Sequence, residues 1–280
     1  MPLTTRSPQD VPETAIVMPD GITYRRVETL AEYQQCVALE EAIWGVGFRE
    51  LVPSAILMVA QKVGGVCAGA FAPDGRLLGF VFGMTGLRHG ELVHWSDMLA
   101  VRPEARGAQV GQRLKEVQRA LCLEIGIRTM YWTFDPIVAR NAHLNLVRLG
   151  ARAAEYVENL YGSDTGSPLH GALETDRWIA AWDLTQTADP VAPPTPPPEA
   201  PFVVWPSSDG TMPEGEALPA AAVVRVAIPV DHEQLTHGQR VAWRHATRRA
   251  LLHYLALGYH VTHFQRALGE APPFYTLGAP

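Results

Sequence analysis

The segment from Leu92 to Gly111 constrains the fold more than any other part of the chain. Its sequence, LVHWSDMLAVRPEARGAQVG, reads as a β-strand that continues through a glycine-containing loop into a helix. The first N–H groups of a helix have no intrahelical partner, and the helix dipole makes that end positive. A strand, a loop and a helix in this order therefore predict an anion site and point to a phosphorylated ligand.

Two common phosphate-binding signatures do not fit this loop. The segment Arg106–Gly111 lacks the Lys-Ser/Thr ending of a P-loop. It also lacks the glycine spacing and the following acidic residue of a dinucleotide-binding turn. A nucleoside triphosphate and NAD are therefore not the expected ligands.

The same residues resemble the coenzyme A loop of the GCN5-related N-acetyltransferases (GNAT superfamily). That pattern is Arg/Gln-x-x-Gly-x-Gly/Ala at the start of a helix, after a strand that ends in Leu-Ala-Val-x-Pro. The chain has Leu-Ala-Val-Arg-Pro at Leu99–Pro103, then Arg106 and Gly111, with Gln109 where the family usually has glycine. The resemblance implies a divergent member with an α+β fold, a mixed, mostly antiparallel sheet flanked by helices. Acetyl-CoA or coenzyme A would be the co-substrate.

Hydrophobic periodicity and turn residues predict the order of elements on both sides of the loop. The expected elements are strand 22–27, helices 30–44 and 54–63, strands 66–72, 77–87 and 92–101, helix 109–125, strand 127–134, helix 139–149, and strands 151–162 and 177–184. This is the element order of the acetyltransferase family, so the resemblance covers about residues 22–184.

Composition shifts divide the chain into four parts. We expect a loose N-terminal tail at 1–21, a GNAT-like acetyltransferase domain at 22–186, a Pro-rich linker at 187–220 and a C-terminal β-α-β unit at 221–280. The linker assignment rests on the run TADPVAPPTPPPEAP, which cannot form helix or sheet ladders. The C-terminal unit is too small to be a stable domain alone, so it should pack on the first domain or on a partner subunit, which leaves a homodimer open.

Composition also narrows the function classes. The chain has 280 residues, of which 47% are hydrophobic, and a net charge of −6, so nucleic acid is not an expected partner. No apolar stretch reaches the roughly 18 to 20 residues of a membrane helix, and the N-terminus does not read as a secretory signal. Three widely spaced cysteines, Cys36, Cys67 and Cys122, predict buried free thiols in a reducing, cytoplasmic location. The C-terminal histidines lack metal-ligand spacing, so no metal is expected.

The resemblance assigns the coenzyme to the strand and loop. Loop amides and the charge of Arg106 would hold the pyrophosphate, and the exposed backbone of a splayed strand would pair with the pantetheine arm. A backbone N–H of Met98 or Leu99 would stabilise the oxyanion of the tetrahedral intermediate. The expected coenzyme-binding residues are Met98, Leu99, Ala100, Val101, Arg106, Gly107, Ala108, Gln109, Val110, Gly111 and Asn141.

The proton-transfer groups are less closely defined. Family members often have a Tyr four residues before the Gly that ends the second helix, where it protonates the departing thiolate, but Leu146 stands at that distance from Gly150. His143, Tyr161 and Tyr156 are the candidate acids that remain, and each also fits a packed or exposed side chain.

The candidate general base is Asp97, with His94 on the opposite strand face, so that one of the two should face the cleft. Asp135 follows the next strand and is either a site carboxylate or a helix cap.

Two further groups of residues have a functional and a structural interpretation. Trp44, Phe48, Trp95 and Trp132 either line an acceptor pocket or belong to the core. Arg240, Arg244 and Arg248 recur at every fourth residue and form a basic stripe, which is either solvated or in contact with the first domain or with anionic ligands.

The sequence therefore predicts a protein that transfers an acetyl or other acyl group from coenzyme A to an amine of a small molecule or a peptide. An alternative is a non-catalytic coenzyme A or ligand-binding module of the same fold, suggested by Gln109 and by the missing Tyr. A scaffold role for the arginine-striped unit is also open.

Overall fold

The chain forms two β-sheets with helices packed against them. The computed structural model describes residues 15–162, 166, 173–186, 197 and 199–280. The first sheet has eight strands in the order β1-β2-β3-β4-β5-β6-β8-β7, and the second has five in the order β10-β9-β11-β13-β12. Within the first sheet, β5 and β6 are parallel and the other neighbours are antiparallel. The predicted α+β class, with a mixed and mostly antiparallel sheet, is confirmed.

The elements of the first sheet and its helices are β1 Ile16–Val17, β2 Thr23–Arg26, α1 Leu30–Trp44, α2 Ser54–Lys62, β3 Val66–Phe71, β4 Leu77–Arg88, β5 Glu91–Val101, η1 Pro103–Ala105, α3 Val110–Glu124, β6 Thr129–Phe134, α4 Ala139–Ala142, η2 His143–Arg148, β7 Arg152–Val157 and β8 Arg177–Asp183. The C-terminal unit comprises β9 Phe202–Pro206, β10 Pro213–Glu214, β11 Val223–Ala227, η3 His232–Gln234, α5 His237–Ala256, β12 His260–Gln265 and β13 Phe274–Gly278.

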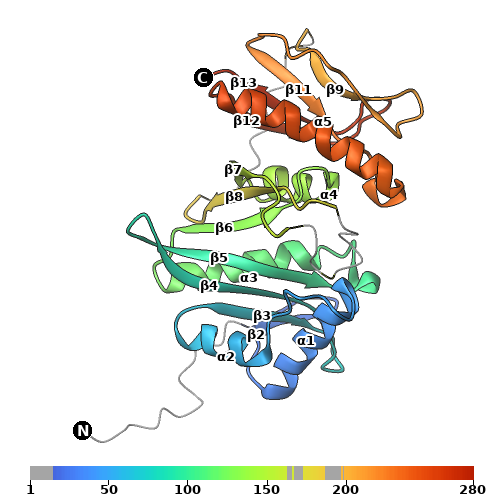
Figure 1. Ribbon diagram of the computed structural model, residues 1–280. Helices are drawn as coiled ribbons and strands as arrows, with labels where there is room; N and C mark the ends of the chain where they lie inside the picture. The colour runs from blue at the N-terminus through green and yellow to red at the C-terminus, as the bar shows by residue number, and fades with distance from the viewer. Residues whose placement is uncertain (1–14, 163–165, 167–172, 187–196, 198) are drawn as a thin grey trace, which may run out of the picture.

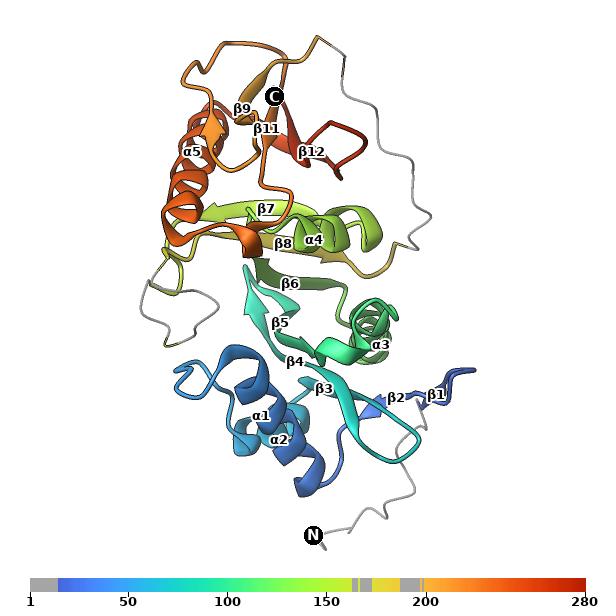
Figure 2. The same ribbon diagram turned by 90° about the vertical axis from the view of Figure 1, so that its right-hand side faces the viewer.

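Helices cover both faces of the first sheet. Helices α1 and α2 lie on one face and α3 on the other (Figure 2). Leu57 and Phe80 belong to the core under α1 and α2, whereas Leu114 and Trp132 belong to the core under α3. Alternate side chains of the central strands therefore point into different cores, which holds the middle of the sheet rigid.

The segment predicted as one helix at 139–149 changes its hydrogen-bond pattern midway. It begins as α4 and continues as the π-helical turn η2, in which the N–H of Leu149 donates to the carbonyl of Leu144 at 2.9 Å. The wider turn brings Asn145 inward, where its Oδ1 accepts from the indole N–H of Trp132 at 3.1 Å. π-helical turns of this kind are frequent at functional sites.

Strands occupy parts of the chain where the sequence analysis expects a tail and a linker. β1 lies within 1–21 and pairs with β2, which satisfies the backbone groups of that edge. β9 and β10 lie within 187–220, and Val203 and Val204 of β9 are fully buried. The prolines before residue 202 dominate the composition of this region, so the composition alone did not predict the short buried strand that follows them. Residues 187–196 and 198 of the expected linker lie outside the described residues.

The C-terminal unit is larger than a β-α-β unit. β13 adds a strand after β12 and pairs with both β11 and β12, so that five strands and α5 make up the unit. It stacks on the β7 and β8 end of the first sheet (Figure 1). The Tyr275 hydroxyl donates to the carbonyl of Pro136 at 2.7 Å, and its ring contacts Trp178. The two units thus share one continuous core.

In the part of the chain that the structure describes, no helix combines the length and the apolar character that crossing a membrane requires. Cys36, Cys67 and Cys122 are buried free thiols, as expected.

Candidate active site

The central feature of the site is the divergence of the two parallel strands. β5 pairs with β6 from Val93 to Trp95, opposite Thr129 to Tyr131, and the recorded pairing ends there. Beyond this point β5 keeps its ladder with β4, while β6 keeps its ladder with β8. The gap opens into a cleft of about 1340 Å³. One edge of β5 is therefore free to pair with an extended ligand.

The glycine-containing loop lies at the open end of this cleft. Arg106, Gly107, Gln109 and Gly111 line it. Gly107 has φ 86°, and Gln109 has φ 60° and ψ 13° at the N-cap of α3. A side chain at a left-handed backbone position is unusual, and glycine is the residue that adopts it without cost. Gln109 therefore adopts a bend that glycine provides without strain, directly before the first turn of α3, whose N–H groups have no intrahelical partner. Ala108 is exposed and does not line the cleft.

The cleft carries a surplus of positive charge although the chain has a net charge of −6. Its basic lining residues are Arg106, Lys115, Arg140, Arg148, Arg177, Arg240 and Arg266, and its acidic lining residues are Glu50, Asp97, Asp135 and Glu233. Together with the N-terminus of α3, this lining favours a ligand with several negative charges.

Asp97 faces the cleft because the β4–β5 ladder is irregular at this point. Ser96 is opposite Gly83 and Met98 is opposite Phe82, so Asp97 is the extra residue of a β-bulge. Its side chain is open to the cleft, yet protein surrounds it closely enough that burial raises the pKa of its carboxyl, and the charge of Glu50 raises it further. A carboxylate with a raised pKa in a cleft is a good proton acceptor.

His94 has a structural environment. It is fully buried, its Nδ1 lies 3.2 Å from the Thr85 hydroxyl, and its Nε2 lies 3.0 Å from the side-chain amide of Gln118. A Cβ at Gly83 would overlap the His94 ring, so this glycine makes room for it. Burial lowers the pKa of His94 to about 3, which keeps the imidazole neutral. Of the two alternatives that the sequence left open, Asp97 is the residue in the cleft.

The candidate acids are not equivalent. His143 and Tyr161 line the cleft, and Tyr156 does not. Burial, followed by the charges of Arg266 and Arg148, lowers the pKa of His143, and its Nδ1 is buried without a hydrogen-bond partner in the described structure.

The hydroxyls of the two tyrosines have different neighbours. That of Tyr161 lies 3.0 Å from the Thr133 hydroxyl on β6. The Tyr156 hydroxyl donates to Asp176 at 2.5 Å, and burial raises the pKa of Tyr156 far above its usual value. Tyr156 is therefore bound within the protein rather than available to a ligand.

The remaining predicted residues fall on both sides of the cleft wall. Asn141, Met98, Leu99, Val101 and Val110 line the cleft, whereas Ala100 is buried away from it. Among the aromatic candidates, Trp44, Phe48 and Trp132 line the cleft and Trp95 does not. The Trp44 and Phe48 rings stack at 5.7 Å and form an apolar wall on the α1 side.

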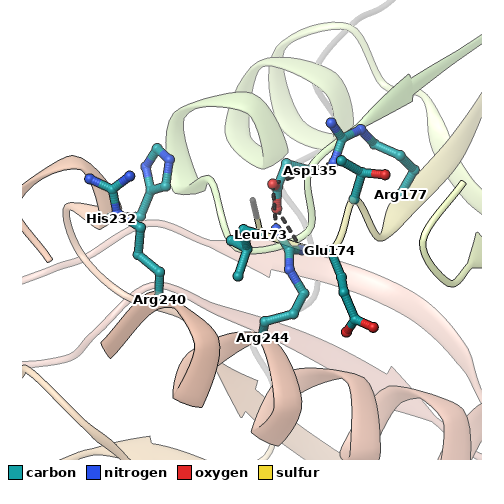
Figure 3. A pocket seen from close by; sticks show the side chains of 8 residues that line it. Asp135, Leu173, Glu174, Arg177, His232, Arg240 and Arg244 are labelled. Atoms are coloured by element: carbon teal, nitrogen blue, oxygen red, sulfur yellow. Dashed lines mark hydrogen bonds and ion pairs between the residues drawn. The ribbon is translucent and has the colours of Figure 1, made fainter. Parts of the chain in front are cut away.

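Asp135 and the arginine stripe hold the C-terminal unit to the first sheet. Both carboxylate oxygens of Asp135 accept from Arg244, at 2.9 and 2.6 Å (Figure 3). Oδ1 of Asp135 also accepts from the N–H of Ile137 at 2.9 Å. Arg248 pairs with Asp176 and Glu174. Arg244 and Arg248 thus contact the first domain, one of the interpretations open for this stripe, while Arg240 lines the cleft.

The structure brings residues into the cleft that the sequence analysis did not single out. Lys115 lines it from α3, and His232, Glu233 and Arg266 line it from the C-terminal unit, beside the predicted Arg240. Lys115 is next to Leu114 in the apolar stripe of α3 and three residues before Gln118. Two polar residues so close to a buried helix face are the one local signal that could have marked Lys115 as a site residue. No local pattern marks the C-terminal residues, because their place depends on how the two units pack. Among the described residues, no group of three or more His, Cys, Asp or Glu is arranged to hold a metal ion.

Comparisons with solved structures return acetyltransferases. The chain is similar to the ribosomal-protein-S18-alanine N-acetyltransferase of Escherichia coli, with 16% identity, a TM-score of 0.45, and coverage of 60% of this chain and 97% of that one. It is similar to a putative acetyltransferase of Salmonella typhimurium with acetyl-CoA bound, at 18% identity and a TM-score of 0.44, covering 61% and 98%. It is also similar to Arabidopsis thaliana Naa50 in complex with a bisubstrate analogue, with 12% identity, a TM-score of 0.45, and coverage of 57% of this chain and 97% of that one.

No protein-family model and no curated protein sequence matches the chain. These solved structures are acetyltransferases, as the loop motif led us to expect, but at this identity and TM-score they describe a similarity and do not assign a function. The function proposed next rests on the residues of the cleft.

Proposed function

We propose that the protein is an acyl-CoA-dependent N-acyltransferase. The observation that carries this proposal is the divergence of β5 from β6 into a cleft of about 1340 Å³, with the N-terminus of α3 at its open end and Asp97 on a bulge in its wall. An anion site, a free strand edge and a proton acceptor follow one another along a single cleft. Phosphates, an extended arm and a reacting thioester follow one another in the same order in an acyl coenzyme A.

The coenzyme would lie along β5. N–H groups of the Arg106–Gly111 loop and of the first turn of α3 hold its phosphates, and Arg148 is held beside them by its 3.0 Å hydrogen bond to Gln112. The backbone of Met98–Val101 pairs with the pantetheine arm as an added strand, and Asn141 supports the arm from the α4 side. The N–H of Met98 stabilises the oxyanion that forms on the thioester carbon.

The acceptor is an amine of a small molecule or a peptide. The carboxylates of Glu50 and Asp97 lie on the α1 side of the cleft beside Trp44 and Phe48 and attract a cationic amine. Asp97 takes a proton from the ammonium form of the acceptor, and the neutral nitrogen then attacks the carbonyl carbon and releases a second proton to solvent as the amide forms. The C–S bond then breaks, and His143 or Tyr161 gives a proton to the departing thiolate.

Two measurements test this function. Calorimetric titration with acetyl-CoA should show saturable binding, and Arg106→Gln should weaken it. Release of free thiol from acetyl-CoA in the presence of a panel of primary amines should identify an acceptor class. Absence of binding at millimolar acetyl-CoA refutes the proposal. Tight binding with no thiol release across the panel refutes the catalytic part and favours a coenzyme-binding module.

A further inference from the structure

At the closed end of the cleft lies a buried ammonium group that pairs with no carboxylate among the described residues. Lys115 is 2% exposed, and it lines the cleft together with Ser96 and Trp132. Its Nζ donates to the Ser96 hydroxyl at 2.7 Å and to the Gln118 side-chain carbonyl at 3.4 Å. It also lies 4.0 Å from the centre of the Trp132 ring. These partners are neutral, so they hydrogen-bond to the ammonium group without balancing its positive charge.

The side chains that the structure describes around this ammonium group carry no opposing charge. β5 contributes Ser96 and, one hydrogen bond further away, His94, which is neutral. β6 contributes Met130 and Trp132, and α3 itself contributes Gln118 and Cys122. Burial lowers the pKa of Lys115 to about 7, and the neighbouring Cys122 thiol is itself held neutral by burial. An anion next to Nζ would remove this penalty.

Lysine is rare in this chain, and one of its few lysines is the buried Lys115. It contains two lysines, Lys62 and Lys115, and all its other basic side chains, histidine aside, are arginines. Lys62 is exposed at the end of α2. A buried arginine would remain charged, whereas a buried lysine shifts its pKa readily and recovers its charge when an anion arrives.

The position of Lys115 relates it to the acyl group. Ser96 and Trp132 are the residues directly after the last β5–β6 pair, Trp95 opposite Tyr131, so Lys115 marks the vertex at which the strands diverge. A coenzyme with its phosphates at the start of α3 and its thioester at Met98 directs its acyl chain toward this vertex. Met98 and Ser96 lie on either side of the bulge at Asp97 and are therefore at most about 7 Å apart along the strand, a distance that an acyl chain of about four carbons covers.

We propose that the acyl donor is a dicarboxylic acyl-CoA, whose terminal carboxylate pairs with Lys115 and the Ser96 hydroxyl at the vertex of the cleft. This inference rests on the proposed function and names the donor class for the same site. The transfer itself is unchanged: the amine nitrogen bonds to the thioester carbon, the C–S bond breaks, and the thiolate leaves with a proton. The distal carboxylate takes no part in bond making.

The first test compares donors of matched length on the full chain. Calorimetry at pH 6.5 should show succinyl-CoA binding at least about tenfold more tightly than butyryl-CoA, and malonyl-CoA more tightly than propionyl-CoA, because a hydrogen-bonded buried charge pair discriminates by this order. Lys115→Met should abolish the preference, so that the charged and the neutral donor of each pair bind equally. Lys62→Met, the matched control, should keep the preference.

A second measurement uses the unmodified protein and does not depend on the folding of a variant. At pH 8 most Lys115 side chains are neutral before binding, so binding of succinyl-CoA should take up more protons than binding of butyryl-CoA. Titrations in two buffers of different ionisation enthalpy measure this difference. Equal affinity and equal proton uptake for charged and neutral donors overturn the inference and leave the proposed function intact. Failure of every thioester to bind, acetyl-CoA included, refutes the proposed function itself.

Discussion

Removing the charge of Asp135 should destabilise the protein more than removing the charge of its partner Arg244. Arg244 is 1% exposed, and both of its terminal nitrogens donate to Asp135. Arg177 lies 3.5 Å from the same carboxylate, and burial lowers its pKa. In Asp135→Asn, two buried guanidinium groups lose their carboxylate, and we expect a loss of about 3–5 kcal/mol of unfolding free energy. In Arg244→Met, Asp135 keeps Arg177 and the N–H of Ile137, so a loss of about 1–2 kcal/mol is expected.

The pH dependence gives a second estimate of the same interaction. The charges of Arg244 and Arg177 outweigh desolvation and lower the pKa of Asp135 to about 2. A carboxyl whose pKa is lower in the folded state stabilises the fold above its unfolded pKa, near 4, and this contribution disappears as the pH falls toward 2. A shift of this size corresponds to about 2 kcal/mol at neutral pH. The difference in unfolding free energy between wild type and Asp135→Asn should therefore be largest at pH 7 and should become smaller below about pH 4.

Urea unfolding followed by tryptophan fluorescence measures both effects, because Trp178 and Trp243 report on the two units. The double variant Asp135→Asn/Arg244→Met should lose less than the sum of the single losses, with a coupling of about 1–3 kcal/mol. Equal losses for the two single variants, strict additivity, or a loss for Asp135→Asn that persists unchanged at pH 3 would refute the reasoning.

Four further outcomes are expected. Asp97→Asn should lower turnover roughly hundredfold in the thiol-release assay and keep acetyl-CoA affinity, and unchanged turnover would exclude it as the base. Activity should rise with pH through the raised pKa of Asp97, and Glu50→Gln should move that rise to lower pH, since a negative neighbour has been removed. Gln109→Gly should tighten coenzyme binding and raise stability by up to about 1 kcal/mol, because glycine adopts φ 60° without strain. Burial raises the pKa of Glu40 to about 7, so its ionisation destabilises the fold as pH rises from about 4.5 past 7, and Glu40→Gln should raise the melting temperature at pH 8 and not at pH 5.

Local signals in the sequence were sufficient for the elements that build the first sheet. The helix expected at 30–44 is α1, because Thr29 and Glu32 form a capping box at its start and Gly45 ends it. The order of strands and helices through 184 is confirmed as far as it is described, apart from the π-helical turn η2. That turn was not predictable, because its side-chain spacing fits an α-helix until Asn145 finds Trp132 across the core.

The site was predictable in its backbone and less so in its side chains. Strict alternation along β5 would place His94 and Asp97 on opposite faces, but which face is the cleft depends on the bulge at Asp97 and on the packing of α3. Lys115 could not be recognised from spacing alone, since its importance follows from the vertex formed by Ser96 and Trp132. β9 and β13 are short, and each pairs with β11 as well as with the strand next to it in the chain, so no local signal marks the pairing with β11.

The contacts that dock the C-terminal unit and the composition of the cleft depend on each other. Asp135 lines the cleft and also anchors Arg244, and the same unit brings Arg240 and Arg266 to the cleft wall. Arg266 is exposed and close enough to His143 to lower its pKa, so it supplies positive charge to the cleft from the C-terminal unit. A cleft formed by the first sheet alone would lack this charge. Ligand affinity should therefore depend on how firmly the second unit is docked, and a ligand bound between the units should in turn hold them together.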